Sequence, residues 1–201
     1  MTSGLKWEED VTEYQIQNEK DWAKGILSQK QDKYPGKSFN YSTGDTYLLG
    51  LVIQNATGKE LKTYMEEKLL TPLNITCEYW HKNNDQYTSG CNFFITPKEM
   101  AIFGQMILDK GKYKDKQIVP QNWIDISTKE TISLREEEEC SYGYLWWIDH
   151  IKNHKVITAW GHGGQMIHII PDKKMVVVFT TDSSGDEGFS FGVLEEILSH
   201  S

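Results

Sequence analysis

The chain has 201 residues, of which 38% are hydrophobic and 12% aromatic, enough for one folded domain with a sizeable core or a large part of a bigger one. The formal net charge is −8 and no basic patch is visible, which argues against a nucleic-acid partner because such binding begins with phosphate contacts. No apolar run reaches the roughly 18 residues that span a bilayer, so no membrane segment is predicted.

Helical periodicity dominates the first part of the chain. Residues 7 to about 30 are predicted to form helix and loop, and the Tyr34-Pro35-Gly36 segment ends this region. A second helix is expected from Asp45 to the terminator Gly58. The apolar positions that set these two predictions are Trp7, Val11, Tyr14, Trp22, Ile26, Leu27, Leu48, Leu51 and Val52.

Two further helices follow. One carries an apolar face of Leu61, Tyr64, Met65 and Leu69, and Pro72 is expected to stop it. The other has the clearest start in the chain, with Thr96 as N-cap, Pro97 at the first helical position and Glu99 completing a capping box. Gly111 closes this helix, and its predicted buried face consists of Met100, Phe103, Met106 and Ile107.

The pattern becomes strand-like after the four glutamates at 136–139, which we interpret as a solvated loop. Successive antiparallel strands are expected, the last two joined by a turn at 171–174. The run 176–179 does not alternate, which predicts a strand covered on both faces. An amphipathic helix with Phe191, Leu194 and Leu198 ends the chain. The expected strands are 142–148, 156–160 with 165–170, and 175–181.

This order predicts an α+β protein, mainly helical over residues 1–140 and built of antiparallel strands with a closing helix over 141–201. So few strands would leave an open edge beside an apolar strand, and nothing N-terminal looks like its partner. The first residues also lack a capping or leader pattern. We therefore expect that the natural protein continues upstream of Met1 and that this chain is incomplete at its N-terminus.

The segment Tyr41-Ser42-Thr43 is the first candidate for chemistry. A tyrosine in the turn before a helix lies near the positive end of the helix, where its phenolate can be favoured and can accept a proton. Judged by itself, a tyrosine in a polar turn is more often a half-buried packing residue.

The segment Gly161-His162-Gly163-Gly164-Gln165 is the second candidate. Glycines weaken a strand and mark places where a ligand or another chain approaches the backbone closely. The backbone N–H of Gln165 could then donate to a carbonyl oxygen that His162 orients or polarises. A bulge with a hydrogen-bonded histidine is the alternative interpretation.

Taken together and in this order, the two segments resemble the second and third signatures of the serine β-lactamase and penicillin-binding protein family, closest to its class C-like branch of esterases, DD-peptidases and amide hydrolases. The resemblance covers essentially the whole chain and implies a β-lactamase/DD-peptidase-like fold. Further blocks similar to the family are residues 1–7, 70–75, 111–113, 118–120 with Trp123, and 142–147.

The resemblance assigns a role to each matching residue. Tyr41 stands at the tyrosine of the Y-x-N signature, the general base of that branch, whereas Thr43 replaces the asparagine. His162-Gly163-Gly164 matches the K-T-G box with histidine for lysine. Gln165 follows the box where the family takes one oxyanion N–H, so Gly163, Gly164 and Gln165 are the predicted substrate and oxyanion residues.

The first family signature, S-x-x-K, supplies the nucleophilic serine and its assisting lysine. The literal match Ser3-Gly4-Leu5-Lys6 is not expected to be the nucleophile, because the family serine opens a long buried helix well before this block. Covalent catalysis by this chain alone is therefore not expected.

Other constellations are weaker. His150 and His154 flank a predicted turn, which disfavours a metal site, and His168 is expected to be a hydrogen-bonded residue of an apolar strand. The three cysteines show no C-x-x-C pattern, which favours reduced or isolated thiols: Cys77, Cys91 and Cys140.

Two functional hypotheses follow. The parent protein is a serine hydrolase that attacks an ester, amide or β-lactam carbonyl of a small-molecule or peptide-like acyl substrate. The alternative is a non-catalytic binding protein, or an inactive fragment, that keeps the cleft without the nucleophile. The resemblance implies no cofactor and, by analogy only, a periplasmic or extracellular location; the sequence does not decide the substrate or the oligomeric state.

Overall fold

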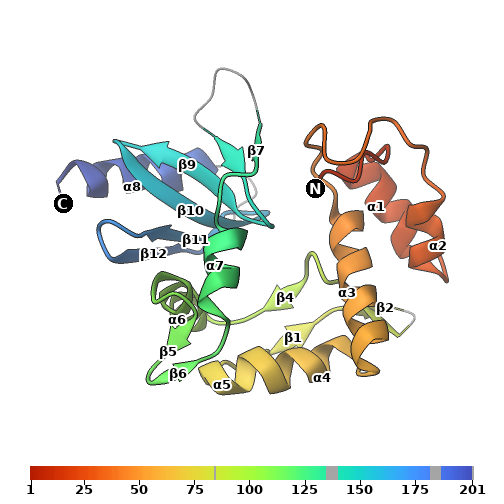
Figure 1. Ribbon diagram of the computed structural model, residues 1–201, viewed down its shortest axis with the longest axis horizontal. Helices are drawn as coiled ribbons and strands as arrows, with labels where there is room; N and C mark the ends of the chain where they lie inside the picture. Colours follow the sequence, from red (N-terminus) through yellow and green to blue (C-terminus); the bar gives the residue numbers. More distant parts are fainter. Residues whose placement is uncertain (84, 135–139, 182–186, 201) are drawn as a thin grey trace. The chain divides into compact units, whose positions relative to one another are not determined.

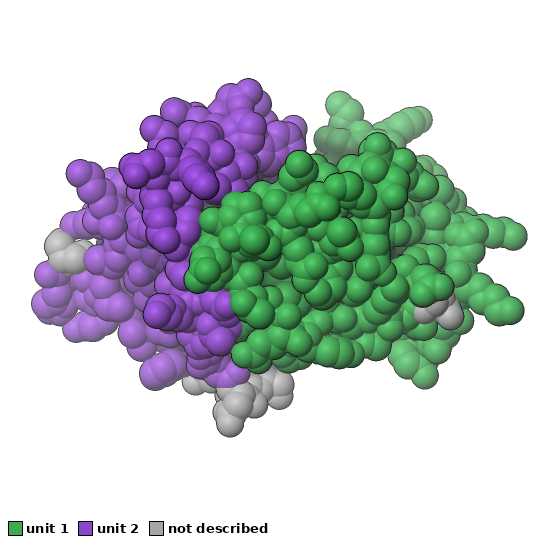
Figure 2. Space-filling view, turned by 90° about the horizontal axis from the view of Figure 1, so that it is seen from below, with its two compact units in different colours: residues 1–95 green, residues 96–201 purple. Residues whose placement is uncertain are grey.

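The computed structural model describes residues 1–83, 85–134, 140–181 and 187–200. The chain forms two compact units, residues 1–95 (unit 1) and 96–201 (unit 2), which are coloured separately in Figure 2. The sequence suggested a change of element type at residue 140, but the compact units divide earlier because the helix that begins at Pro97 packs on strands of the C-terminal sheet. The four glutamates at 136–139 lie outside the described residues.

Unit 1 is built from helices with short strand pairs between them (Figure 1). The strand pairs are β1 with β4 and β2 with β3, each antiparallel. The elements are α1 (Glu9–Gln17), α2 (Trp22–Leu27), α3 (Thr43–Thr57), α4 (Leu61–Met65), the π-helical turn η1 (Glu66–Leu70), α5 (Thr71–Leu73), β1 (Tyr79–Trp80), β2 (Lys82–Asn83), β3 (Gln86–Tyr87) and β4 (Phe93–Phe94).

Helix α3 has the defined ends that its sequence predicts. The Ser42 side chain accepts a hydrogen bond from the Asp45 backbone N–H, so the helix begins at Thr43, two residues before the predicted start. At the other end Gly58 adopts φ +66°, a left-handed conformation that costs glycine little, and this confirms the predicted terminator.

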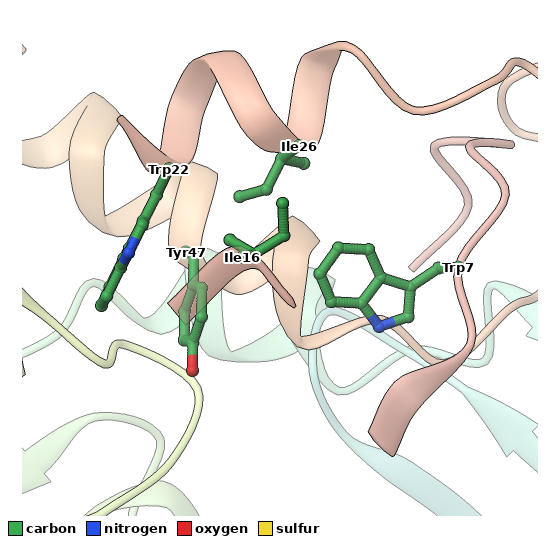
Figure 3. Close-up of a cluster of buried hydrophobic side chains, with 5 residues drawn as sticks. All are labelled: Trp7, Ile16, Trp22, Ile26 and Tyr47. Atoms are coloured by element: carbon green, nitrogen blue, oxygen red, sulfur yellow. The ribbon is translucent and has the colours of Figure 1, made fainter. Parts of the chain in front are cut away.

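The core of unit 1 is aromatic as much as aliphatic (Figure 3). The Trp22 and Tyr47 rings stack with centroids 4.8 Å apart. The predicted apolar stripes were partly wrong, because burial follows packing between helices as well as the period of each one. Buried side chains of this core are Trp7, Ile16, Trp22, Ile26 and Tyr47, whereas Val11, Tyr14, Leu27 and Val52 are exposed.

The prediction that Pro72 stops a helix was also wrong. Helices α4, η1 and α5 follow one another directly, and the run continues through Pro72, which lies in the first turn of α5 directly after the π-helical turn. The run ends instead at Asn74, which takes a left-handed φ of +58°.

Unit 2 contains one six-stranded antiparallel sheet in the order β12-β11-β10-β9-β8-β7 (Figure 1). The predicted capping box of α6 is confirmed, since Thr96 and Glu99 each bond the backbone N–H of the other. The elements are α6 (Pro97–Leu108), β5 (Lys112–Tyr113), β6 (Lys116–Gln117), α7 (Gln121–Ser127), β7 (Ile132–Ser133), β8 (Ser141–Tyr142), β9 (Trp147–Ile151), β10 (His154–Gly161), β11 (Gln165–Ile170), β12 (Met175–Phe179) and α8 (Glu187–Ser199).

The sheet has more strands than the sequence predicted. The expected strand 142–148 is divided between β8 and β9, and the expected pair 156–160 and 165–170 forms the hairpin β10–β11. The missed short strand β7 pairs with β8. The whole sheet is therefore a meander, in which each strand is joined to its neighbour by a local connection.

Helices from unit 2 cover both faces of β12, as its unbroken apolar run predicted. Leu194 and Leu198 of α8 pack with Val177, while Gly104 of α6 approaches so closely that a Cβ there would lie 2.7 Å from Val176. In the described part of the chain β12 pairs only with β11, so its other edge has no described strand beside it. Among the described residues no helix is both long and apolar enough to cross a membrane.

His168 is fully buried in β11, as expected, but only one of its ring nitrogens is satisfied. Nδ1 lies 2.9 Å from the hydroxyl of Thr158 on β10, whereas Nε2 has no hydrogen-bond partner among the described residues. The rings of Phe179 and Phe191 pack edge-on against the imidazole. Burial lowers the pKa of His168 to about 4, so the ring is neutral at pH 7.

This burial predicts a loss of stability in acid. Above pH 6.5 His168 is neutral in both the folded and unfolded chain; between pH 6.5 and about 4 only the unfolded chain binds the proton. The free energy of unfolding should therefore fall by about 1.4 kcal/mol per pH unit on account of this residue. The free energy of unfolding of His168→Leu, measured by urea denaturation at several pH values in that range, should change with pH by about 1.4 kcal/mol per pH unit less than that of the unaltered chain.

The matched control is His200→Leu, which makes the same replacement at an exposed position near the end of α8. Equal slopes in the His168→Leu variant and the unaltered chain would contradict the assignment of acid sensitivity to His168.

Candidate active site

The five predicted site residues lie in both units. Tyr41 belongs to unit 1, and His162, Gly163, Gly164 and Gln165 belong to unit 2.

Tyr41 stands immediately before Ser42, the N-cap of α3, as the sequence predicted. Its side chain is partly buried, whereas Ser42 and Thr43 are buried. The N-cap bond from Ser42 fixes the turn, because the side chain must face the first turn of the helix to accept the Asp45 N–H at 3.2 Å. The phenol is therefore carried on a rigid junction between loop and helix.

The surroundings of Tyr41 do not favour its phenolate. Burial raises the pKa of Tyr41, and the carboxylates of Glu9 and Glu13, together with the Cys91 thiolate that forms at high pH, raise it further. This is the opposite of the effect expected from the helix N-terminus alone. With its pKa raised above the usual value for tyrosine, the Tyr41 hydroxyl is protonated at neutral pH.

The second half of the site is the turn between β10 and β11. Register pairs Gly161 with Gln165, and the intervening His162, Gly163 and Gly164 form the turn, closed by a bond from the Gly164 N–H to the Gly161 carbonyl at 3.3 Å. The histidine was expected on a strand; it lies instead at the tip of a hairpin, and its side chain is exposed. Gly163 and Gly164 adopt φ values of +83° and +81°, which side chains other than glycine rarely adopt.

Two polar side chains clamp this turn. The Gln165 amide nitrogen donates to the carbonyls of Gly163 at 3.2 Å and Thr181 at 2.8 Å, and the Thr181 hydroxyl also donates to the Gly163 carbonyl. Thr181 follows β12, so the clamp ties the turn to a neighbouring strand end. Gln165 is the first residue of β11. Its backbone pairs with Gly161 in the β10–β11 ladder, and its side chain bonds the turn and Thr181.

The rejected candidates occupy other surroundings. Ser3 lies in an irregular segment next to Gly4, which takes φ +74°, and no helix begins there. His154 pairs with Asp172 at 2.5 Å, and His150 lies 3.6 Å from Glu130. Across the described ranges no group of three metal-ligating side chains is assembled.

Cys77 and Cys91 are free thiols, as expected, and all three cysteines are partly buried: Cys77, Cys91 and Cys140.

Sequence reasoning missed the residues that surround the two motifs. Glu9, Glu13 and Cys91 act on Tyr41 from 28 to 50 positions away in the chain, and Thr181 contacts the turn from 18 positions beyond Gly163. No local pattern marks them, because their relevance arises only when α1, α3 and the strand ends are packed.

Comparisons with known proteins agree over almost the whole chain. A family model described as Beta-lactamase matches residues 1–199. A solved structure of a candidate 6-aminohexanoate-dimer hydrolase from Bacillus anthracis is 25% identical, with a TM-score of 0.81 over 99% of this chain and 56% of that one. A solved octameric penicillin-binding protein homologue from Pyrococcus abyssi is 21% identical, with a TM-score of 0.73 over 99% of this chain and 51% of that one.

The matching proteins are longer than this chain. An uncharacterized protein of Alkalihalophilus pseudofirmus is 23% identical over 124 residues, which cover 56% of this chain and 37% of that protein. The chain thus spans about half the length of the two solved structures and little more than a third of the curated relative. The structural matches confirm the predicted α+β fold of the β-lactamase/DD-peptidase type.

The turn geometry predicts different costs for two adjacent glycines. A Cβ on Gly163 would have ordinary contacts, the nearest at 3.4 Å, so Gly163→Ala should cost only the left-handed backbone strain of about 1–2 kcal/mol. A Cβ on Gly164 would lie 2.6 Å from the Thr181 hydroxyl and push it off the Gly163 carbonyl. Gly164→Ala should therefore cost about 1 kcal/mol more, measured by urea denaturation with Gly163→Ala as the matched control.

Combining each substitution with Thr181→Val provides the second test. Once the hydroxyl clamp is absent, the extra cost of alanine at position 164 over position 163 should shrink. If the two glycine substitutions cost the same with Thr181 present, the clamp does not constrain the turn.

Proposed function

This chain belongs to the Beta-lactamase family, and from that premise we propose that it forms part of a serine hydrolase, which attacks an ester, amide or β-lactam carbonyl through an acyl-enzyme. The observation that carries the proposal is the pairing of two rigid motifs in family order. Tyr41 lies on the capped N-terminal turn of α3, and His162-Gly163-Gly164 forms the clamped tip of the β10–β11 hairpin.

In the proposed reaction the serine hydroxyl oxygen attacks the carbonyl carbon while the hydroxyl proton moves to Tyr41. The carbonyl oxygen takes the negative charge, and the Gln165 backbone N–H donates to it beside Gly163 and Gly164. The proton then passes to the leaving oxygen or nitrogen as its bond to carbon breaks. Water hydrolyses the acyl-serine in a second step, and His162 aligns the substrate throughout. The proposal involves no metal or organic cofactor.

The serine and its assisting lysine belong, in this proposal, to an S-x-x-K segment upstream of Met1. The electrostatics of Tyr41 support that arrangement. Burial, Glu9, Glu13 and Cys91 all raise the pKa of Tyr41, and a positive charge next to it would favour the phenolate that a base requires. The lysine of S-x-x-K is the group that would supply this charge.

The alternative is a non-catalytic binding protein or an inactive fragment that keeps the cleft. Two observations favour it for this chain taken alone. The literal S-x-x-K match at residues 3–6 does not open a helix, and the pKa of Tyr41 is raised by its described surroundings. The two hypotheses differ in whether a nucleophilic serine reacts.

A fluorophosphonate probe, which labels activated serines, tests the proposal. The 201-residue chain alone should remain unlabelled, and the natural polypeptide that carries it should be labelled at an upstream serine. Tyr41→Phe in that polypeptide should slow labelling by about 10²-fold or more, because the general base is lost. The matched control is Tyr34→Phe, since Tyr34 is 84% exposed in a loop of the same unit.

Three outcomes contradict the mechanism. The natural polypeptide could fail to react, which favours the binding protein; Tyr41→Phe could react as fast as Tyr34→Phe; or label could appear on Ser3 of the 201-residue chain.

A further inference from the structure

Glu9 places its carboxylate at the start of α3, where it accepts three hydrogen bonds. The indole Nε1–H of Trp7 donates to Oε2 at 2.5 Å, and the backbone N–H of Thr43 donates to the same oxygen at 3.0 Å. The Thr43 hydroxyl donates to Oε1. One carboxylate from α1 thus joins a tryptophan of the preceding segment to the residue that completes the Tyr41-Ser42-Thr43 motif.

The backbone N–H of Thr43 needs an acceptor such as the Glu9 carboxylate. The first backbone N–H groups of a helix have no intrahelical partner, and Thr43 is the first residue of α3. Ser42 satisfies the N–H of Asp45, two residues further along, and therefore leaves the Thr43 N–H to another acceptor. Thr43 is only 5% exposed, so water is a poor substitute for Glu9.

Close packing holds the three partners in this arrangement. The Trp7 indole lies so near Gly44 that a Cβ there would be 2.4 Å from the ring. On another side, a Cβ on Gly90 would be 2.9 Å from the methyl carbon of Thr43. The two glycines allow Trp7 and Thr43 to approach, and the Thr43 methyl and hydroxyl groups consequently occupy defined positions.

We propose that Glu9 is a positioning residue of the candidate site, which fixes the Tyr41-Ser42-Thr43 segment and accepts the hydrogen bond that the Thr43 hydroxyl donates. A threonine hydroxyl has one proton to donate and two lone pairs to accept with. Because the Thr43 hydroxyl already donates its hydrogen bond to Glu9, a substrate group that reaches position 43 meets only an acceptor. The asparagine of the Y-x-N signature would instead offer both a donor and an acceptor.

This inference rests on the proposed function only where it concerns substrate. A position that accepts but does not donate suits an N–H or ammonium group of the substrate and gives no hydrogen bond to a carbonyl oxygen. Thr43 therefore favours a substrate that directs an amide N–H or an amine toward α3.

Glu9 also acts on Tyr41 through its charge. The carboxylates that raise the pKa of Tyr41 are Glu9 and Glu13 on α1, and Cys91 in the loop before β4 adds to the effect once its thiol ionises at high pH. Glu13 differs from Glu9 in its contacts, since its carboxylate accepts from the Tyr47 hydroxyl at 2.8 Å and from Gln17 at 2.9 Å. The two carboxylates therefore provide a matched pair in which only one bonds to Thr43.

The test compares Glu9→Gln with Glu13→Gln in the 201-residue chain by NMR. The hydrogen-exchange rate of the amide at position 43 reports whether its N–H is bonded to Glu9, an interaction that we call the Glu9 tether. A ¹³C-detected pH titration of the Tyr41 ring reports the effect of each carboxylate charge on the Tyr41 pKa. Glu9→Gln should speed exchange at least tenfold and lower the pKa of Tyr41. Glu13→Gln should lower that pKa as well but leave the exchange rate at position 43 unchanged.

Two variants at position 43 keep the test decisive if Glu9→Gln fails to fold. Thr43→Ser retains the hydroxyl and should keep slow exchange, whereas Thr43→Val removes it and should speed exchange while the Tyr41 pKa stays raised. The proposal is overturned if Glu9→Gln alters exchange at position 43 no more than Glu13→Gln, or if Thr43→Val exchanges as slowly as Thr43→Ser.

These measurements separate the inference from the proposed function. A natural polypeptide that never reacts with the serine probe would remove the hydrolase assignment while leaving the Glu9 tether intact. Fast exchange that does not depend on Glu9 would remove the tether while leaving the labelling result unaffected.

Discussion

The first turn of α3 imposes the constraint on which unit 1 depends. A buried helix N-terminus leaves several backbone N–H groups to be satisfied, and here Ser42 and Glu9 accept from two of them. Meeting this need from Glu9 brings α1 against α3, and the tryptophan that also bonds Glu9 covers Gly44. Tyr47, one turn further along the same helix, stacks on Trp22 of α2 in the aromatic core (Figure 3). The position of Tyr41 is a consequence of this packing.

Unit 2 meets a comparable need in a different way. The hairpin turn at His162 cannot satisfy all its carbonyls within the β10–β11 ladder, so the Gln165 amide and the Thr181 hydroxyl bond the Gly163 carbonyl. Helices α6 and α8 pack on opposite faces of the sheet whose strands carry this turn. The exposed histidine is therefore mounted on a rigid turn.

The charge around Tyr41 connects the fold to the proposed chemistry. Carboxylates on α1 stabilise the helix start and the buried tyrosine network, but they oppose the phenolate that a general base requires. The same groups that hold the Tyr41 segment in place therefore disfavour its phenolate. This is a physical reason for the proposed dependence on an upstream lysine.

The sequence by itself determined the features that depend on local geometry. The Thr96–Glu99 capping box and the terminator Gly58 each act within a few residues of the helix end that they fix, so the sequence predicted the start of α6 and the end of α3. The start of α3 was predicted two residues late, at Asp45, because the Ser42 cap was not recognised. The motif order around Tyr41 and His162 likewise indicated the family that the comparisons show. The number of strands was underestimated, because β7 and β8 are two residues long and too short to show a period.

Only the tertiary structure decided which side chains surround the motifs. Glu9 reaches Thr43 across 34 positions and Thr181 reaches Gly163 across 18, and hydrogen bonds at such separations leave no periodic trace in the sequence. The place of Pro72 was also decided by the structure: a local rule predicted a helix end there, but Pro72 lies in the first turn of α5. The sign of the shift in the Tyr41 pKa also depended on packing, because burial and charges from other segments outweigh the local helix N-terminus.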